Sequence, residues 1–238
     1  MSTSNTKTPL RVGVLYEHTQ MTDLAGLDLL GNLTPAPSPS SPPYSSYAPL
    51  LAHATPMEFL YISSSLSPAW TTPNMYVTPT HTYANAPRDL DILLLGGPDP
   101  MNVHEDSLAF LREASQRTKV ILTTCTGGMW LARSGVLDGK KATTNRVMLG
   151  PAGQIKPEVE WVDQRWVVEK GCFDGAEIWT AGGAGCGIDM FIEYTYQNFN
   201  KKIVELGCRG LDLDFEGRTR QFYKTPLPGP LSLAAMDD

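Results

Sequence analysis

The sequence predicts an α/β sandwich in which a parallel β-sheet lies between layers of helices. Short runs of consecutive apolar residues, typical of strands buried on both faces, alternate along the chain with segments of helical spacing. Strands that alternate with helices in this way form parallel β/α units. The 238 residues, 42% of them hydrophobic, are enough for one sizeable core, and no internal repeat is visible. We therefore expect a single domain.

The first half of the chain contains three apolar runs that predict buried strands, at Arg11–Tyr16, Met57–Ser63 and Asp91–Leu95. Between the first two runs, leucines at helical spacing predict a helix over Met21–Leu33. The third strand is stopped by Gly96-Gly97-Pro98, a combination typical of a turn.

The second half of the chain continues the same alternation. Short apolar runs predict strands at Lys119–Thr124, Ala142–Thr144 and Ile178–Ala181. Apolar residues at helical spacing predict helices at Ser107–Ser115, Thr126–Ser134 and Gly187–Asn200. Trp161 and Trp166, in a loosely alternating segment, are expected to pack on a sheet. Asp189 is expected to cap the last helix or to lie in its first turn.

Three segments are expected to lie outside this pattern. The polar residues 1–9 predict a disordered leader. Between Pro35 and Pro49, eleven of fifteen residues are Pro or Ser, which excludes a helix or a central strand. We interpret residues 34–56 as an exposed loop inserted in a domain that spans 10–208. Residues 209–238 are expected to form a loose C-terminal extension or an arm over a neighbouring subunit.

Composition excludes several classes of partner. The net charge is −6 and no run of Lys or Arg is present, which disfavours nucleic acid and anionic membrane surfaces. No apolar run approaches the roughly 20 residues that span a bilayer, and the N-terminus lacks the apolar core of a secretory signal. The four cysteines are widely and irregularly spaced, which disfavours a disulfide framework or a zinc site. We expect a cytoplasmic protein with no metal.

The junction at Cys125 carries the strongest functional signal. An apolar strand leads directly into Cys125, two glycines follow, and a helix begins at once. A nucleophile elbow has this pattern, because small neighbours let the turn hold the nucleophile in a strained conformation. A thiol at a helix N-terminus is favoured as thiolate. For Cys172, Cys186 and Cys208 the simpler interpretation, a packed apolar side chain, is preferred.

Four sequence blocks resemble the DJ-1/PfpI superfamily, and within it the branch that includes bacterial isonitrile hydratases. They lie between about residues 10 and 200 and are Thr22-Asp23-Leu24-Ala25-Gly26, Leu94-Leu95-Gly96-Gly97-Pro98, Cys125-Thr126-Gly127 with the following Gly135–Thr144, and Gly182–Asp189. The resemblance implies a flavodoxin-like fold, also described as class I glutamine amidotransferase-like, with the elbow after a central strand. It also implies a homodimer and a site at the carboxyl ends of the strands.

The resemblance assigns roles to particular residues. Cys125 is the implied nucleophile and Asp23 the implied acid, since a carboxyl group near a thiolate in a dry pocket is favoured in its protonated form. Asp23 is also a plausible helix cap, and Glu17 is a rival for the acid position. Thr126 is expected in the catalytic site, where its N–H joins a donor from Gly97 in an oxyanion site. The residues expected to contact substrate are Gly96, Gly97, Asn145 and Trp130, the last as pocket wall or core.

One departure from the family pattern bears on the chemistry. Many members have a histidine directly after Ala-Thr-Thr, where this chain has Asn145. Without that imidazole a Cys–His pair is disfavoured, which counts against glyoxalase or peptidase chemistry. Asn145 is instead expected to bind a substrate or order a water.

These observations favour a cofactor-free lyase or hydratase in which Cys125 adds to a small electrophilic substrate and Asp23 supplies a proton. A place in small-molecule or secondary metabolism fits this chemistry. Two alternatives stay open: a glyoxalase III-like enzyme acting on α-oxoaldehydes, and a non-enzymatic redox sensor or stress protein that uses oxidation of Cys125.

Overall fold

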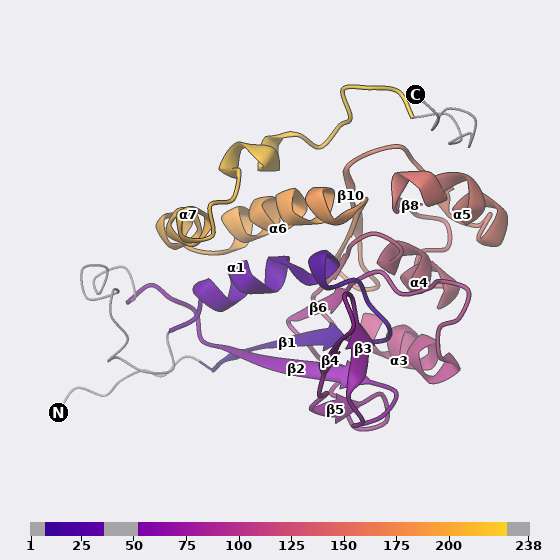
Figure 1. The fold of residues 1–238 in the computed structure, drawn as a ribbon, viewed down its shortest axis with the longest axis horizontal. Helices are drawn as coiled ribbons and strands as arrows, with labels where there is room; N and C mark the ends of the chain where they lie inside the picture. Colours follow the sequence, from indigo (N-terminus) through magenta and orange to yellow (C-terminus); the bar gives the residue numbers. More distant parts are fainter. Residues whose placement is uncertain (1–7, 36–51, 228–238) are drawn as a thin grey trace.

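A seven-stranded sheet runs through the middle of the molecule (Figure 1) in a computed structural model that describes residues 8–35 and 52–227. Its strand order is β10-β11-β7-β6-β1-β2-β5, and every neighbouring pair is parallel except β10 and β11. The strands are β1 (Leu10–Leu15), β2 (Met57–Ser63), β5 (His81–Thr82), β6 (Ile92–Leu95), β7 (Val120–Thr123), β10 (Trp166–Lys170) and β11 (Glu177–Ala181). The predicted parallel sheet is confirmed.

Helices cover both faces of this sheet. One face is covered by α1 (Gly26–Asn32), α6 (Ala184–Asn198) and α7 (Lys201–Gly210), and the other by α3 (Glu105–Ser115) and α4 (Gly127–Arg133). Because side chains alternate along a strand, β6 divides its four buried residues between the two cores: Ile92 and Leu94 face the first set of helices, Leu93 and Leu95 the second. Burial on both faces explains the unbroken apolar runs of the central strands.

Several short elements were not expected from the sequence. β3 (Ala69–Thr71) and β4 (Met75–Val77) form a hairpin outside the main sheet, and α5 (Leu149–Ile155) precedes β9 (Glu160–Trp161). The predicted strand near Ala142–Thr144 is β8 (Lys141–Ala142), which pairs only with β9. These runs are too short for hydrophobic periodicity to identify.

Two helix starts differ from the predictions, and both differences shape the site. The segment expected as one helix over Met21–Leu33 begins as a 3₁₀ turn, η1 (Met21–Leu24), before α1. The last long helix begins at Ala184 rather than Gly187, so Asp189 is buried inside the helix instead of capping it. Asp189 forms an ion pair with Arg165, which stabilises its charge.

Of the three segments outside the predicted pattern, the structure describes parts. Residues 1–7 of the predicted leader, 36–51 of the predicted insertion and 228–238 of the C-terminal extension lie outside the described residues. Residues 211–227 are described, and η4 (Phe215–Thr219) packs against α6 of the same chain. No helix in the described ranges is long and apolar enough to cross a membrane.

Candidate active site

Cys125 lies at a sharp turn between β7 and α4, at the carboxyl ends of the central strands. Its backbone φ is 57°, in the left-handed region that residues other than glycine rarely adopt. The turn is tight because Gly127 packs on the end of the neighbouring strand β6: a Cβ there would lie 2.6 Å from the Leu95 carbonyl oxygen. The strained elbow predicted from the sequence is confirmed.

Two other loops hold the strained turn in place. The Cys125 N–H donates to the Gly182 carbonyl at 2.5 Å, just after β11. The Thr144 hydroxyl donates to the Cys125 carbonyl at 2.9 Å, just after β8. The backbone N–H and carbonyl of Cys125 therefore both have hydrogen-bond partners, which offsets part of the cost of its conformation.

Asp23 reaches the elbow from the 3₁₀ turn after β1, and its side chain is buried. One carboxylate oxygen, Oδ2, accepts the Gly97 N–H at 3.0 Å, whereas Oδ1 has no hydrogen-bond partner among the described residues. A Cβ on Gly97 would lie 2.6 Å from Asp23 Oδ2, 2.7 Å from Thr126 Oγ1 and 3.1 Å from Cys125 Cβ. Three of the predicted catalytic side chains thus converge on one glycine.

The environment opposes negative charge on both the Asp23 carboxyl and the Cys125 thiol. Burial raises the pKa of Asp23 to about 6, although the hydrogen bond from Gly97 acts in the opposite direction. Burial, followed by the charge of Asp23, raises the pKa of the Cys125 thiol above its ordinary value. The lowered thiol pKa expected from the helix N-terminus is therefore not found. At pH 7 the pair consists mainly of a carboxylate beside a neutral thiol.

Asn145 contacts the Cys125 thiol directly. Its Nδ2 donates to Cys125 Sγ at 3.3 Å, and this bond lowers the pKa of the thiol. Its Oδ1 accepts the Val147 N–H at 3.2 Å, so the amide is oriented with its nitrogen toward the sulfur. The sequence predicted a substrate-binding or water-ordering role for Asn145 and did not predict this contact.

A model of the DJ-1/PfpI family matches residues 50–196, a range that includes both Cys125 and Asn145. The chain belongs to this family. The isonitrile hydratase of Pseudomonas putida is 26% identical over 147 residues, which are 59% of this chain and 59% of that enzyme. The chain thus spans less than two thirds of the length of that enzyme.

Solved DJ-1/PfpI structures share the fold. A THiJ/PfpI family protein from Pseudomonas syringae has a TM-score of 0.66 and 20% identity, over 87% of this chain and 76% of that one. DJ-1beta from Drosophila melanogaster has a TM-score of 0.62 and 17% identity, over 87% and 99% of the two chains. At these identities the likeness shows the flavodoxin-like fold, as predicted.

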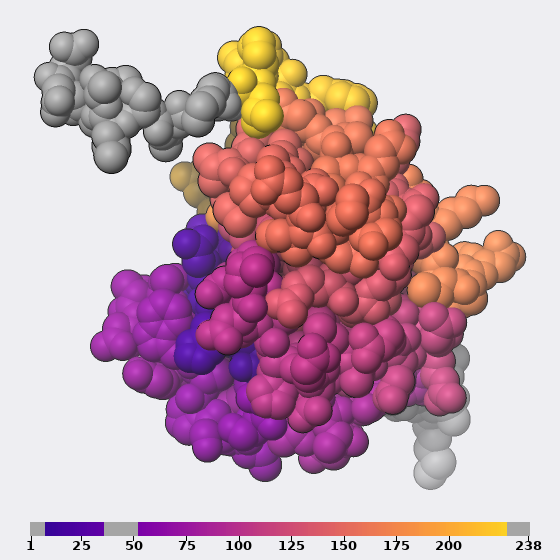
Figure 2. Space-filling model, turned by 90° about the vertical axis from the view of Figure 1, so that its right-hand side faces the viewer, coloured from indigo at the N-terminus to yellow at the C-terminus, as the bar shows by residue number. Residues whose placement is uncertain are grey.

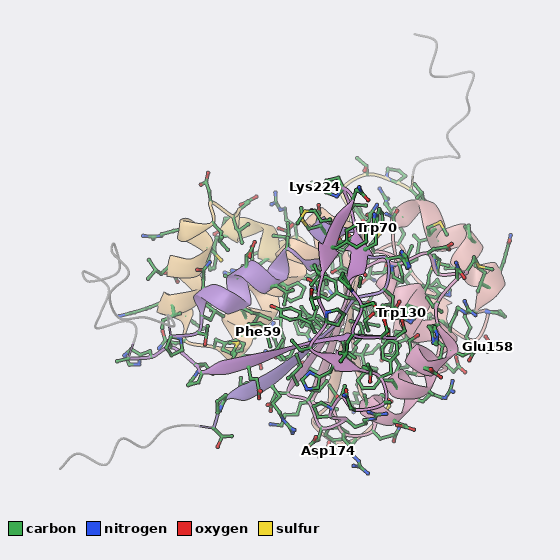
Figure 3. The ribbon with its side chains drawn as sticks, turned by 60° about the horizontal axis from the view of Figure 1, so that its bottom comes forward. Phe59, Trp70, Trp130, Glu158, Asp174 and Lys224 are labelled. Carbon is green, nitrogen blue, oxygen red and sulfur yellow. The ribbon has the colours of Figure 1, made fainter. Side chains whose placement is uncertain are left out.

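Not every predicted residue lies where the prediction put it. Trp130, labelled in Figure 3, lies among the crowded side chains inside the molecule and is completely buried. Its indole N–H donates to Ser107 Oγ of α3 at 2.8 Å. It is a core residue and offers no surface to a substrate, because it lies in the core cluster with Leu108 and Leu111 of α3. Gly96 packs against Thr19 and Leu24, and a Cβ there would clash with Thr19 Cγ2. Gly96 shapes the turn behind the site.

The N–H groups of Gly97 and Thr126, predicted as oxyanion donors, already form hydrogen bonds within the protein. The Gly97 N–H already serves Asp23, and the Thr126 hydroxyl donates to the Pro98 carbonyl at 2.6 Å. The Thr126 N–H hydrogen-bonds Cys125 and lowers the pKa of its thiol. The two predicted backbone donors are therefore directed at Asp23 and Cys125 of the protein itself.

Sequence reasoning missed two residues that hold the elbow, Thr144 and Gly182. Both fall in blocks that carry the family resemblance, so the sequence indicated that these segments matter. It did not indicate that their hydrogen bonds hold the backbone of Cys125. Within residues 8–35 and 52–227, no group of three or more His, Cys, Asp or Glu side chains converges to hold a metal ion.

Proposed function

We propose that this DJ-1/PfpI protein is a cysteine-dependent hydratase that adds water to a small electrophile with a carbon–nitrogen multiple bond, an isonitrile being the representative case. The observation that carries the proposal is the buried Asp23 carboxyl beside the Cys125 thiol, with one carboxylate oxygen unpartnered among the described residues. Such a pair can exchange one proton between a nucleophile and a substrate. The relationship to an isonitrile hydratase supports this choice of substrate.

The proposed reaction needs water as its only co-reactant. Asp23 takes the thiol proton as Cys125 attacks and passes it to the terminal carbon of R–N≡C, which leaves a thioimidate, R–N=CH–S–Cys125. Water then adds to that carbon, with its proton going to the nitrogen. The C–S bond breaks, the sulfur regains a proton, and R–NH–CHO leaves. Asn145 stabilises the sulfur whenever it carries negative charge.

The direct test is incubation with cyclohexyl isonitrile, with the N-formamide product followed by mass spectrometry. The native chain is expected to form it, and Cys125→Ala to lose at least about a thousandfold in rate, as removal of a covalent nucleophile does. Cys172→Ala is the matched control, because Cys172 is an exposed free thiol. Equal turnover by Cys125→Ala would eliminate covalent catalysis at this elbow.

The two alternative functions fit the site less well. Glyoxalase III-like chemistry lacks an imidazole at the Asn145 position, and lactate formed from methylglyoxal would be its signature. A redox sensor favours an exposed thiolate, whereas Cys125 is buried with a raised pKa. Sulfinic acid on Cys125 under mild peroxide, with altered partner binding, would favour the sensor. The homodimer and the cytoplasmic location stay predictions.

A further inference from the structure

The C-terminal segment Gln221–Thr225 lies beside the candidate active site, although it is outside the range that the family model matches. It is anchored to the start of β10 by two hydrogen bonds: the Arg165 N–H donates to the Gln221 carbonyl at 2.9 Å, and Gln221 Nε2 donates to the Trp166 carbonyl at 3.1 Å. Figure 1 shows this yellow segment continuing from η4 along the helical layer of α6. The segment is therefore held against the body of the domain.

Tyr223 is the residue of this segment that reaches inward. Its hydroxyl lies 3.3 Å from Cys186 Sγ, and a Cβ on Gly182 would lie only 2.8 Å from the hydroxyl oxygen. The carbonyl of Gly182 is the group that accepts the Cys125 N–H. Tyr223 thus packs on the residue that holds the nucleophile's backbone.

The same segment clamps Arg146, the neighbour of Asn145 in the chain. The Arg146 guanidinium lies 3.8 Å from the centre of the Tyr223 ring and donates to the Thr225 carbonyl at 2.8 Å. It also forms two hydrogen bonds to Asp163, of 2.7 and 2.6 Å. The Tyr223 ring thus covers one face of the Arg146 guanidinium, and hydrogen bonds to Asp163 and Thr225 engage its N–H groups. An arginine held in this way has little freedom to move.

We infer that the segment Gln221–Thr225 positions the Asn145 amide against Cys125 by fixing Arg146, with Tyr223 as the positioning residue. Asn145 and Arg146 are adjacent, so a fixed guanidinium restricts the backbone that carries the amide. Its relevance to turnover rests on the proposed function. The positioning of Asn145 against Cys125 is tested through the reactivity of the Cys125 thiol and not through turnover. The positioning role and the proposed hydratase function can therefore fail independently.

The test measures alkylation of Cys125 by iodoacetamide from pH 6 to pH 10 in the full chain, with peptide mass spectrometry. The midpoint of the rate–pH profile reports the thiol pKa, whereas the limiting rate reports access. Tyr223→Ala is expected to move the midpoint upward and to slow the reaction about fivefold at pH 8, since part of a hydrogen bond to a charged sulfur is lost. Tyr223→Phe keeps the ring and is expected to stay within twofold of wild type.

The matched control is Phe222→Ala, which alters the neighbouring residue, 63% exposed, and is expected to change nothing. Asn145→Ala alone is expected to slow the reaction about tenfold, and adding Tyr223→Ala to it is expected to cost no more than a further twofold. Effects that multiply fully, or a Tyr223→Ala profile identical to that of Phe222→Ala, would overturn the inference.

Loss of folding is checked in the same experiment through Cys208, which is 1% exposed and should stay unreactive. If Tyr223→Ala exposes Cys208, the variant Arg146→Lys is used in place of Tyr223→Ala. Lysine keeps the positive charge but lacks the planar guanidinium that binds Asp163, Thr225 and the Tyr223 ring. Arg146→Lys is expected to move the midpoint in the same direction by a smaller amount. An unmoved midpoint in that variant would also overturn the inference.

Discussion

Two carboxylates at the same edge of the sheet have opposite environments. Glu17, half-buried directly after β1, accepts three hydrogen bonds on Oε1: from Ser63 Oγ at 3.1 Å, from the Ser64 N–H at 2.5 Å and from the Tyr83 hydroxyl at 3.1 Å. Asp23, six residues later, is almost fully buried and accepts one hydrogen bond, from Gly97. Figure 2 views this edge, where the indigo residues after β1 lie between purple and magenta parts of the chain.

Under the proposed function, this difference separates a structural carboxylate, Glu17, from the carboxylate proposed to react, Asp23. Three donors stabilise the charge of Glu17, and through them Glu17 ties the end of β1 to the end of β2 and to Tyr83. Asp23 is buried with one backbone donor, and burial raises its pKa to about 6, close enough to neutrality for the proposed acceptance and return of a proton. Burial, together with the number of hydrogen-bond donors, thus distinguishes the two acids more than the type of residue does.

The largest expected effect tests that distinction on turnover of cyclohexyl isonitrile. Asp23→Ala is expected to reduce the rate about 10² to 10⁴-fold, the usual contribution of a positioned acid–base group. Glu17→Ala is expected to reduce it less than about fivefold once the folded fraction is matched by circular dichroism. Equal losses in the two variants would remove the distinction between the carboxylates.

A second effect tests the close packing around Asp23. Gly97→Ala adds a Cβ 2.6 Å from Asp23 Oδ2 and 2.7 Å from Thr126 Oγ1, so these groups must separate. We expect a loss of roughly 3 kcal/mol in the free energy of unfolding, as in overpacked cores, together with loss of turnover. The control is Gly150→Ala, where the new Cβ has no atom within 4 Å. Urea titration of both variants measures the difference, and a stable, active Gly97→Ala would contradict the convergence described here.

A third effect compares stability against pH in conservative variants of the two acids. Because folding raises the pKa of Asp23 from 3.8 to about 6, the folded protein binds the proton more tightly than the unfolded chain. The contribution of Asp23 to stability is therefore full below pH 4 and is lost as the pH rises through 6. Asp23→Asn should match wild type near pH 4 and exceed it by about 2 kcal/mol at pH 7.5.

Glu17→Gln is the matched comparison and should change stability in the other direction. In this variant the three donors still have an amide oxygen as acceptor, but the acceptor no longer carries a charge. We expect a loss of about 1 kcal/mol in the free energy of unfolding at pH 7.5. Denaturant titrations at pH 4, 5.5 and 7.5 measure both variants. A stabilising Glu17→Gln together with a destabilising Asp23→Asn would reverse the assignment of roles.

The sequence contained enough to predict the sheet and the elbow but not the contrast between the acids. Unbroken apolar runs identify β1, β2, β6 and β7 because burial on both faces constrains every residue. Cys125 was visible because a strand, a cysteine and glycines follow one another locally. The donors to Glu17 and Asp23 lie 46 to 74 residues away in the chain, so their arrangement depends on the completed fold.

The same limit explains why the sequence left Trp130 open between core and pocket wall and did not indicate the contacts of Tyr223. Trp130 lies one turn beyond the elbow, so proximity in sequence suggested a pocket wall, yet that face of α4 packs on α3. Tyr223 has no sequence signal, because its partners Arg146 and Cys186 are 77 and 37 residues away. Contacts between distant segments require the tertiary structure.

The smallest expected effect isolates one donor of the structural carboxylate. Burial and the charge of Glu17 raise the pKa of Tyr83, so its hydroxyl stays protonated and donates. Tyr83→Phe removes that donor, and Glu17 keeps the two bonds from Ser63 and Ser64. The expected cost is about 1 kcal/mol, the net value of one such hydrogen bond, whereas Tyr76→Phe, at a 62% exposed tyrosine, should cost nothing.

Glu17 is hydrogen-bonded to Ser63, Ser64 and Tyr83. We therefore expect Tyr83→Phe to leave the rate–pH profile of Cys125 alkylation unchanged. A shifted midpoint in that variant would show that the two carboxylates are coupled electrostatically across the edge of the sheet. Asp23 would then owe part of its raised pKa to Glu17, and the environment of the reactive acid would have to be extended to both sides of β1.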